Sequence, residues 1–424
     1  MRPTKIVVIG AGSASFGPSS LRDAINCEGL SGSTLVLVDL DAQRLEVMAR
    51  LANRLNEVSG AGLTIEHTTD RKKALPGAEF VITSIAMNRE ALWKLDWEIP
   101  LKHGIKQIMG ENGGPGGLAH ALRNIPVILD ICRDMEKLCP NALLVNFSNP
   151  ESRLCLAVSK HTSIKSVGLC HGIFGSIDRI RRAIGVSDIN AIAAGLNHFT
   201  WMLSITRAST GEDLYPLVRR KSRESAPDEM PLTRYLLDAF GLYPSPGDDH
   251  IGEYIGYAWE IMGLKGYNFD GAREYRENLQ VTIDRLLSDG DFAREYVKGR
   301  SGEIAFNIIR GILADTNELL AAVNIPNNGC ITNLPSDSVV EVPAVVGANG
   351  VMGLCVGDLP DGIAAMCNTQ IGVQRLVVEA AVTGSRRIAL QAMLADPVVQ
   401  SAEAAAKCLD ELLSVHAPYL PRFG

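Results

Sequence analysis

A cysteine and a histidine stand where each could lie at the end of a predicted strand. Cys170 follows the short apolar run 165–169, and His198 follows the small and apolar residues 191–197. A thiolate and an imidazole suit a divalent transition ion, and two protein ligands would leave positions open for substrate oxygens. The alternative is a buried, inert thiol and a hydrogen-bonded core histidine, and the local sequence leaves both interpretations open.

The start of the chain is typical of dinucleotide binding. The apolar run 5–9 predicts a strand, and a turn containing Gly10, Gly12 and Ser13 follows it before a predicted helix. This turn has two of the three glycines of the dinucleotide fingerprint, and Asp39 ends the next strand, where a carboxylate would accept the ribose hydroxyls of NAD. The alternative is a tight turn beside a solvated Asp39.

Three polar residues are candidates for substrate contacts. Asn149 follows a predicted strand, and Pro150 restricts it to extended geometry, although an N-cap role is equally compatible with the local sequence. Glu111 precedes the glycine-rich segment 113–117, where a helix N-terminus could hold substrate or phosphate and a flexible loop is the alternative. Asn88 is the third candidate.

Acidic and imidazole side chains gather again in the sequence Gly247-Asp248-Asp249-His250. Such a cluster could supply a general base. A solvated turn is the alternative, because glycine and aspartate are common turn residues.

The elements that would position these residues alternate between strand and helix in the first half of the chain. We predict a parallel, doubly wound, Rossmann-like α/β sheet from strands at 5–9, 35–38, 80–85 and 143–145 and helices at 19–26, 41–59, 117–138 and 150–161.

The second half is predicted to form a mixed α/β substrate domain. Residues 275–322 are predicted to be helical, 323–346 extended with a turn at 327–329, and 363–394 helical with a break at Gly384. The predicted domain boundaries are 1–198 for the NAD-binding domain and 199–424 for the substrate and oligomerisation domain.

Composition points to a small-molecule enzyme. The 424 residues carry a formal net charge of −7, with 46% hydrophobic and 21% charged residues. The sequence has no cluster of lysines and arginines of the kind that binds nucleic acid or a membrane surface. We find no apolar run long enough to span a bilayer and no secretory signal, and the nine cysteines lack paired spacing. We therefore expect a cytoplasmic protein with reduced thiols.

Several of these segments together resemble glycoside hydrolase family 4, in the right order and over nearly the whole chain. The matching segments are Gly10 to Ser13, Asp39, 114–117 with 121–126, 146–150, 168–171, 195–198, 323–329, 333–335 and 339–343. The resemblance implies an NAD- and manganese-dependent glycosidase, one of the exceptions to the two-carboxylate scheme. In such enzymes the sugar is oxidised at C3 and deprotonated at C2, the aglycone is eliminated, water adds, and C3 is reduced again.

The resemblance also implies roles for individual residues. It makes Cys170 and His198 the Mn²⁺ ligands and places Asn149 against the sugar, and the residues it assigns to the dinucleotide are Gly10, Gly12, Ser13 and Asp39. The metal is needed as a Lewis acid that stabilises the enediolate. The cofactor is needed because oxidation at C3 creates a carbonyl that makes the neighbouring C2 proton acidic.

Two departures from the family pattern concern catalysis. Members that act on phosphorylated sugars carry an aspartate directly after the metal-binding cysteine, as a proposed general acid, whereas this chain has His171. This places the chain with members acting on unphosphorylated sugars. Asp248 resembles the base of the α-glucosidase branch and is our predicted base, with Asp249 and Tyr254 as rivals.

Substrate and partners are less defined. We expect a sugar substrate, an α-galacturonide, α-glucoside or α-galactoside, and a uronic or sulfonated sugar would need a cationic partner such as Arg89, Arg123 or Arg153. The resemblance implies a homodimer or homotetramer. An NAD-dependent dehydrogenase of a hydroxy acid or sugar is the alternative enzyme, and a nucleotide-binding protein without chemistry is the alternative outside catalysis.

Overall fold

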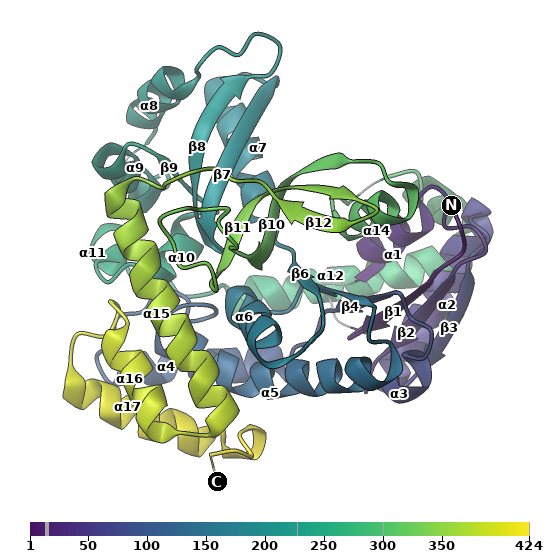
Figure 1. Ribbon diagram of the computed structural model, residues 1–424, viewed down its shortest axis with the longest axis horizontal. Helices are drawn as coiled ribbons and strands as arrows, with labels where there is room; N and C mark the ends of the chain where they lie inside the picture. The colour runs from purple at the N-terminus through teal and green to yellow at the C-terminus, as the bar shows by residue number, and fades with distance from the viewer. Residues whose placement is uncertain (13–16, 227, 300, 424) are drawn as a thin grey trace.

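The computed structural model describes residues 1–12, 17–226, 228–299 and 301–423. One twelve-stranded sheet runs through the chain in the order β3-β2-β1-β4-β5-β6-β10-β11-β7-β8-β9, with β12 paired to β11 (Figure 1). Ser13, which is predicted to bind the dinucleotide, lies outside the described residues.

The first half of the chain forms the parallel part of this sheet. Its strand order, β3-β2-β1-β4-β5-β6, is that of the dinucleotide-binding doubly wound fold, so the predicted fold class is confirmed. The strands are β1 (Lys5–Ile9), β2 (Thr34–Val38), β3 (Thr64–Thr68), β4 (Phe80–Thr83), β5 (Leu143–Asn146) and β6 (Ser166–Gly168). The helices are α1 (Gly17–Ile25), α2 (Ala42–Ser59), α3 (Arg71–Ala74), α4 (Arg89–Lys102), α5 (Gly114–Leu138), α6 (Glu151–His161) and α7 (Gly172–Ile184).

The second half continues the same sheet with antiparallel pairs. Its strands are β7 (Ile189–Leu196), β8 (Phe199–Arg207), β9 (Tyr243–Ser245), β10 (Glu318–Pro326), β11 (Val339–Gly347) and β12 (Gly350–Gly353). Its helices are α8 (Tyr215–Glu224), α9 (Pro231–Phe240), α10 (Asp248–Ile251), α11 (Ala258–Met262), α12 (Phe269–Ser288), α13 (Gly290–Tyr296), α14 (Ala305–Ala314), α15 (Asp361–Thr383), α16 (Arg386–Ala395) and α17 (Ala402–Val415), with short 3₁₀ turns η1 (Gly252–Tyr254) and η2 (Ala417–Tyr419).

The predicted helical stretch 275–322 is wrong at its C-terminal end. Glu318 already belongs to β10, whose leucines and alanines favour a helix by propensity. Pairing with β11 on one side and β6 on the other overrides that preference. The predicted break at Gly384 is confirmed: it caps α15 in the left-handed conformation at φ 69°.

The C-terminal helices pack back onto the first half of the chain. In Figure 1 the yellow helices α16 and α17 lie beside α4 and α5, and α15 crosses α5 and α6. None of the helices in the described part of the chain is long and apolar enough to cross a membrane.

One row of paired residues, running across five neighbouring strands, brings the ends of the central strands together. Asn146 on β5 pairs with Gly168 on β6, and the row continues through Asn324 on β10 and Glu341 on β11 to Gly195 on β7. Cys170 lies two residues beyond this row, at the carboxyl edge of the parallel strands, where ligands of such sheets bind, and His198 lies three residues beyond it in the hairpin between β7 and β8.

Candidate active site

A cleft of about 1590 Å³ opens at this edge of the sheet. Single small ligands usually occupy roughly 300–1,000 Å³, so the cleft has room for a dinucleotide and a sugar together. The sequence-predicted residues that line it are Asn88, Glu111, Asn149, Cys170, His171 and His198, and Asp249 and His250 join them.

The glycine turn after β1 is built around Asp39. The Gly12 backbone N–H donates to Asp39 Oδ2 at 2.8 Å, and Gly10 adopts a left-handed φ of 90°. A Cβ on Gly10 would lie 2.2 Å from the Ser84 carbonyl oxygen, so no side chain fits there. The glycines therefore let the turn pack closely against Ser84 and the Asp39 carboxylate, next to the cleft-lining residues Ser84 and Arg44.

Cys170 and His198 are brought together as the sequence predicted. His198 Nε2 lies 3.2 Å from Cys170 Sγ, and both line the cleft. His198 follows β7 at a left-handed φ of 59°, an uncommon conformation for a histidine and one that often marks a functional position. Burial lowers the pKa of His198 to about 3, so the imidazole is neutral and able to act as a ligand.

The pair fits a divalent transition ion. Nitrogen and sulfur donors bound to one ion at about 2.0 and 2.3 Å lie roughly 3.1–3.6 Å apart, which matches the observed distance. Burial and the Glu341 carboxylate raise the pKa of the Cys170 thiol, and a bound cation would reverse this preference by favouring the thiolate. His198 Nδ1 is buried without a hydrogen-bond partner in the described structure.

Asn149 contacts Glu111 rather than capping a helix. Its Nδ2 donates to Glu111 Oε1 at 3.2 Å, and the Asn149–Pro150 peptide bond is cis. Pro150 occupies the N-cap position of α6 without a side-chain cap, so the alternative N-cap role of Asn149 is wrong. Arg89 Nη2 lies 2.5 Å from the same Glu111 oxygen. An amide, a carboxylate and a guanidinium thus form one polar group on the cleft wall.

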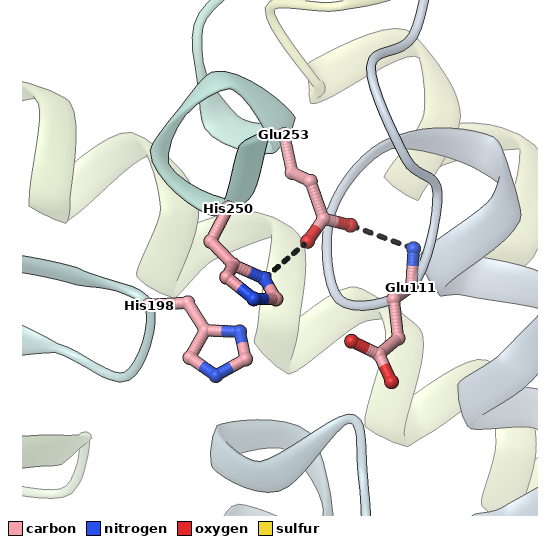
Figure 2. A group of neighbouring side chains, drawn as sticks. All are labelled: Glu111, His198, His250 and Glu253. Atoms are coloured by element: carbon pink, nitrogen blue, oxygen red, sulfur yellow. Dashed lines mark hydrogen bonds and ion pairs between the residues drawn. The ribbon is translucent and has the colours of Figure 1, made fainter. Parts of the chain in front are cut away.

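The sequence prediction named His250 only as part of an acidic cluster and missed Glu253. One oxygen of this buried carboxylate accepts the backbone N–H groups of Glu111, Asn112 and Gly113 at 2.6, 2.7 and 3.1 Å. Its other oxygen lies 3.6 Å from His250 Nδ1, as Figure 2 shows. The loop before α5, predicted to hold substrate or phosphate, therefore already holds a carboxylate of the chain itself.

His250 stands beside the proposed metal ligand. Its ring centroid lies 4.3 Å from that of His198, and Figure 2 shows both rings turned toward the Glu111 side of the cleft. Although burial favours the neutral imidazole, the Glu253 and Asp249 carboxylates raise the pKa of His250 to about 9. The i, i+3 spacing of His250 and Glu253 was the sequence signal that could have found the pair.

The structure places Asp248 away from the reacting space. Its oxygens accept hydrogen bonds from the backbone N–H groups of Leu232 and Thr233 at 2.8 and 2.7 Å and from the Thr233 hydroxyl at 2.6 Å. The carboxylate thus holds the first turn of α9, and it does not line the cleft. Tyr254 is also buried, and its hydroxyl donates to the Asn197 carbonyl oxygen at 3.3 Å.

The remaining predicted residues differ in exposure. Asp249 is exposed in the cleft. His171 is also exposed, and its Nε2 lies 3.0 Å from Glu303 Oε1, a hydrogen bond that raises the pKa of His171. Asn88, with a left-handed φ of 37°, precedes α4 on the cleft rim.

Two of the three arginines considered for an acidic sugar do not line the cleft. Arg123 forms a buried ion pair with Asp96, at 2.8 Å between Nη1 and Oδ1. Arg153 is 1% exposed. Arg89 does line the cleft, where it is paired with Glu111.

Comparison with known proteins decides among the alternatives. Residues 5–186 match the family 4 glycosyl hydrolases, and residues 193–399 match the C-terminal domain of that family. This chain belongs to the family 4 glycosyl hydrolases. The chain is therefore a glycoside hydrolase, and the dehydrogenase alternative is not favoured.

Relatives span the whole chain. An α-glucosidase from Erwinia rhapontici is 36% identical and covers 98% of this chain and 99% of its own. An α-galactosidase from Bacillus subtilis is 33% identical, with 99% of each chain covered. The fold also matches a Thermotoga maritima 6-phospho-β-glucosidase solved with manganese, NAD⁺ and glucose 6-phosphate, with a TM-score of 0.81, 22% identity and coverage of 98% of this chain and 99% of that one.

Proposed function

We propose that this family 4 glycosyl hydrolase cleaves an unphosphorylated α-glycoside, such as an α-galacturonide, α-glucoside or α-galactoside, with NAD⁺ and Mn²⁺ as cofactors. The observation that carries the proposal is the 3.2 Å Cys170–His198 pair in the cleft, beside which the glycine turn packs against the cleft-lining Ser84. When bound, NAD⁺ would supply reversible hydride transfer at C3 of the sugar, and an ion held by Cys170 and His198 would supply Lewis-acid chemistry.

The dinucleotide is assigned to the turn after β1. The backbone at Gly10 and Gly12 would approach the pyrophosphate, Ser13 would bind it as well, and Asp39 would accept the ribose hydroxyls. Asp39 already accepts the Gly12 N–H, which holds its carboxylate at this turn before ligand arrives.

The sugar is assigned to the wall formed by Asn149, Glu111 and Arg89. Their contacts with one another fix the orientation of an amide, a carboxylate and a guanidinium. These groups can donate hydrogen bonds to, and accept them from, neighbouring hydroxyl groups of a sugar. Asn88 would contact the sugar from the cleft rim.

Asp249 replaces Asp248 as our proposed base for the C2 proton. Four carboxylates line the cleft, and three of them are engaged: Glu90 pairs with Arg276, Glu111 with Arg89, and Glu303 with His171. One Asp249 oxygen accepts the His250 backbone N–H at 2.9 Å, but Asp249 has no ion-pair partner among the described residues, so its other oxygen remains available to accept a proton.

We propose His171, a catalytic candidate from the sequence, as the general acid. It lies in the cleft next to Cys170 in sequence, and Glu303 holds its Nε2 at 3.0 Å. An imidazole whose other ring nitrogen is free can donate a proton to the departing glycosidic oxygen.

Hydrolysis of p-nitrophenyl glycosides tests the proposal. We expect α-linked sugars, uronides included, to release p-nitrophenol only when both NAD⁺ and Mn²⁺ are present under reducing conditions. A deuterium at C2 should slow the release, because the C2–H bond breaks during turnover. Stoichiometric accumulation of NADH without glycoside cleavage would contradict the proposal.

A further inference from the structure

We propose that Arg179 binds an anionic group on the sugar and makes an α-linked hexuronic acid the preferred substrate class of this site. The inference rests on the proposed function, because it assigns a specificity residue to the same cleft. It departs from the sequence analysis, which considered other arginines.

The Arg179 side chain extends back along α7 toward the proposed metal ligands. Helical side chains lean toward the N-terminus of their helix, and a Cβ on Gly175 would lie 3.9 Å from Arg179 Nη1. The first turn of α7 contacts the Cys170 thiol, since the Gly172 N–H lies 3.3 Å from its sulfur. One side of α7 therefore lines the cleft from Arg179 through Gly175 and Gly172 to Cys170.

The guanidinium is held from both sides of the cleft wall. Its Nη2 donates to Ser176 Oγ at 3.0 Å, and that hydroxyl lies 2.9 Å from the Pro246 carbonyl oxygen. A Cβ on Gly247 would lie 3.5 Å from the same Nη2. The guanidinium is therefore preorganised between α7 and the segment that carries Asp249, our proposed base.

Arg179 lacks the acidic partner that most other cleft arginines have. Arg89 pairs with Glu111, Arg276 with Glu90, and Arg44 lies 3.4 Å from Asp41. No carboxylate of the described residues lies within ion-pair distance of Arg179, and its Nε is buried without a hydrogen-bond partner.

Arg22 also lines the cleft without an ion pair in the described structure, but its environment differs. Its guanidinium lies over the Tyr296 ring, 4.6 Å from the centroid, and it belongs to the helix after the glycine turn. It therefore stands on the dinucleotide side, whereas Arg179 stands on the helix that begins beside Cys170.

The Arg179 guanidinium, which also hydrogen-bonds to the Tyr243 side chain, lacks a carboxylate partner in the described structure and matches an oxyanion. A planar carboxylate can accept two N–H groups of one guanidinium, and the pairing is strong where water is partly excluded. A sugar carboxylate needs a single cation, whereas a dianionic phosphate would be better matched by several. A hexuronic acid is accordingly the occupant that the site favours.

Kinetics with matched substrates test this assignment. With NAD⁺ and Mn²⁺ bound, we expect the wild type to cleave p-nitrophenyl α-galacturonide with a higher kcat/KM than the α-galactoside. Arg179→Ala should lower kcat/KM for the galacturonide by roughly 10- to 100-fold, chiefly through KM, and leave the galactoside within about 3-fold. For the galacturonide, the kcat/KM of Arg179→Lys should lie between that of the wild type and that of Arg179→Ala. Arg182→Ala, which removes an exposed arginine from the same helix, is the control.

Binding provides a readout that does not need turnover. Calorimetry of the NAD⁺- and Mn²⁺-loaded protein should give tighter binding of galacturonate than of galactose or galactose 6-phosphate, and Arg179→Ala should abolish that difference. Equal affinities of the wild type for galacturonate and galactose would overturn the inference. An equal loss of affinity for both sugars in Arg179→Ala would overturn it as well. If galacturonate binds through Arg179 but no glycoside is cleaved, the inference stands and the proposed function fails.

Discussion

At the scale of single residues, we propose different roles for two adjacent aspartates, Asp249 as the base and Asp248 as a support of α9. Asp249→Asn should lower kcat by roughly 10² to 10⁴, because an amide cannot accept the C2 proton. Asp248→Asn should keep kcat within about 3-fold but lower the free energy of unfolding by about 1–2 kcal/mol, because the charge that holds the first turn of α9 is lost. Steady-state kinetics and urea unfolding of the two variants check both outcomes. The reverse pattern would restore Asp248 as the base.

The proposed metal ligands allow a second test. Cys170→Ser should weaken Mn²⁺ binding by more than about 100-fold, because the changes known to cost 10–100-fold remove only groups that orient a ligand. NAD⁺ affinity should stay close to that of the wild type, since Asp39 and Gly12 lie on other elements. Electron paramagnetic resonance of free Mn²⁺ measures the change, and Cys355→Ser, at an exposed cysteine, is the control. Unchanged Mn²⁺ affinity in the first variant would argue against this ligand.

Sequence reasoning found the residues whose position follows from a strand end and missed those placed by tertiary contact. Cys170 and Asp39 follow short apolar strands, so their place at the sheet edge could be predicted. Glu253 could not be assigned in this way, because its three backbone donors lie about 140 residues earlier in the chain. The contacts of Asp248 could not be predicted for the same reason: the sequence does not show that α9 uses its carboxylate.

At the scale of elements, the turn after β1 depends on Gly12 having no side chain. A Cβ on Gly12 would lie 2.9 Å from Asp39 Oδ2 and 3.1 Å from the Arg44 Cβ. Gly12→Ala should therefore displace the carboxylate and raise the Kd for NAD⁺ by about 10-fold or more. Fluorescence titration of NAD⁺ measures this. Gly372→Ala, on α15 with open space around the added methyl group, is the control and should bind NAD⁺ normally.

The elements themselves were predictable where one local signal dominated. Alternating apolar strands and helices in the first half matched the observed parallel order, and Gly384 marked the end of α15 because a left-handed residue favours glycine. Leu319 and Leu320 gave no such signal, since leucine suits a helix as well as a strand. Only the position of β10 between β6 and β11 makes this segment extended.

At the scale of the whole molecule, the two halves share a sheet and a core. β6 from the first half pairs with β10 from the second, and one hydrophobic cluster contains both Ile6 and Val342. The predicted boundary at residue 198 falls in the turn between β7 and β8, whose register runs from Ile189 opposite Arg207 to Leu196 opposite Phe199. Separating the chain there would split a hairpin and expose strand edges.

We therefore expect the chain to unfold in one cooperative transition. Calorimetry should give a single peak whose Tm rises with NAD⁺ and again with Mn²⁺, because each ligand binds only the folded state. Tryptophan fluorescence can follow the halves separately, since Trp93 and Trp97 lie in the first and Trp201 and Trp259 in the second. Replacing either pair by phenylalanine should leave the same midpoint in the remaining signal. Two midpoints, only one of which moves with NAD⁺, would instead show that the halves unfold as independent domains.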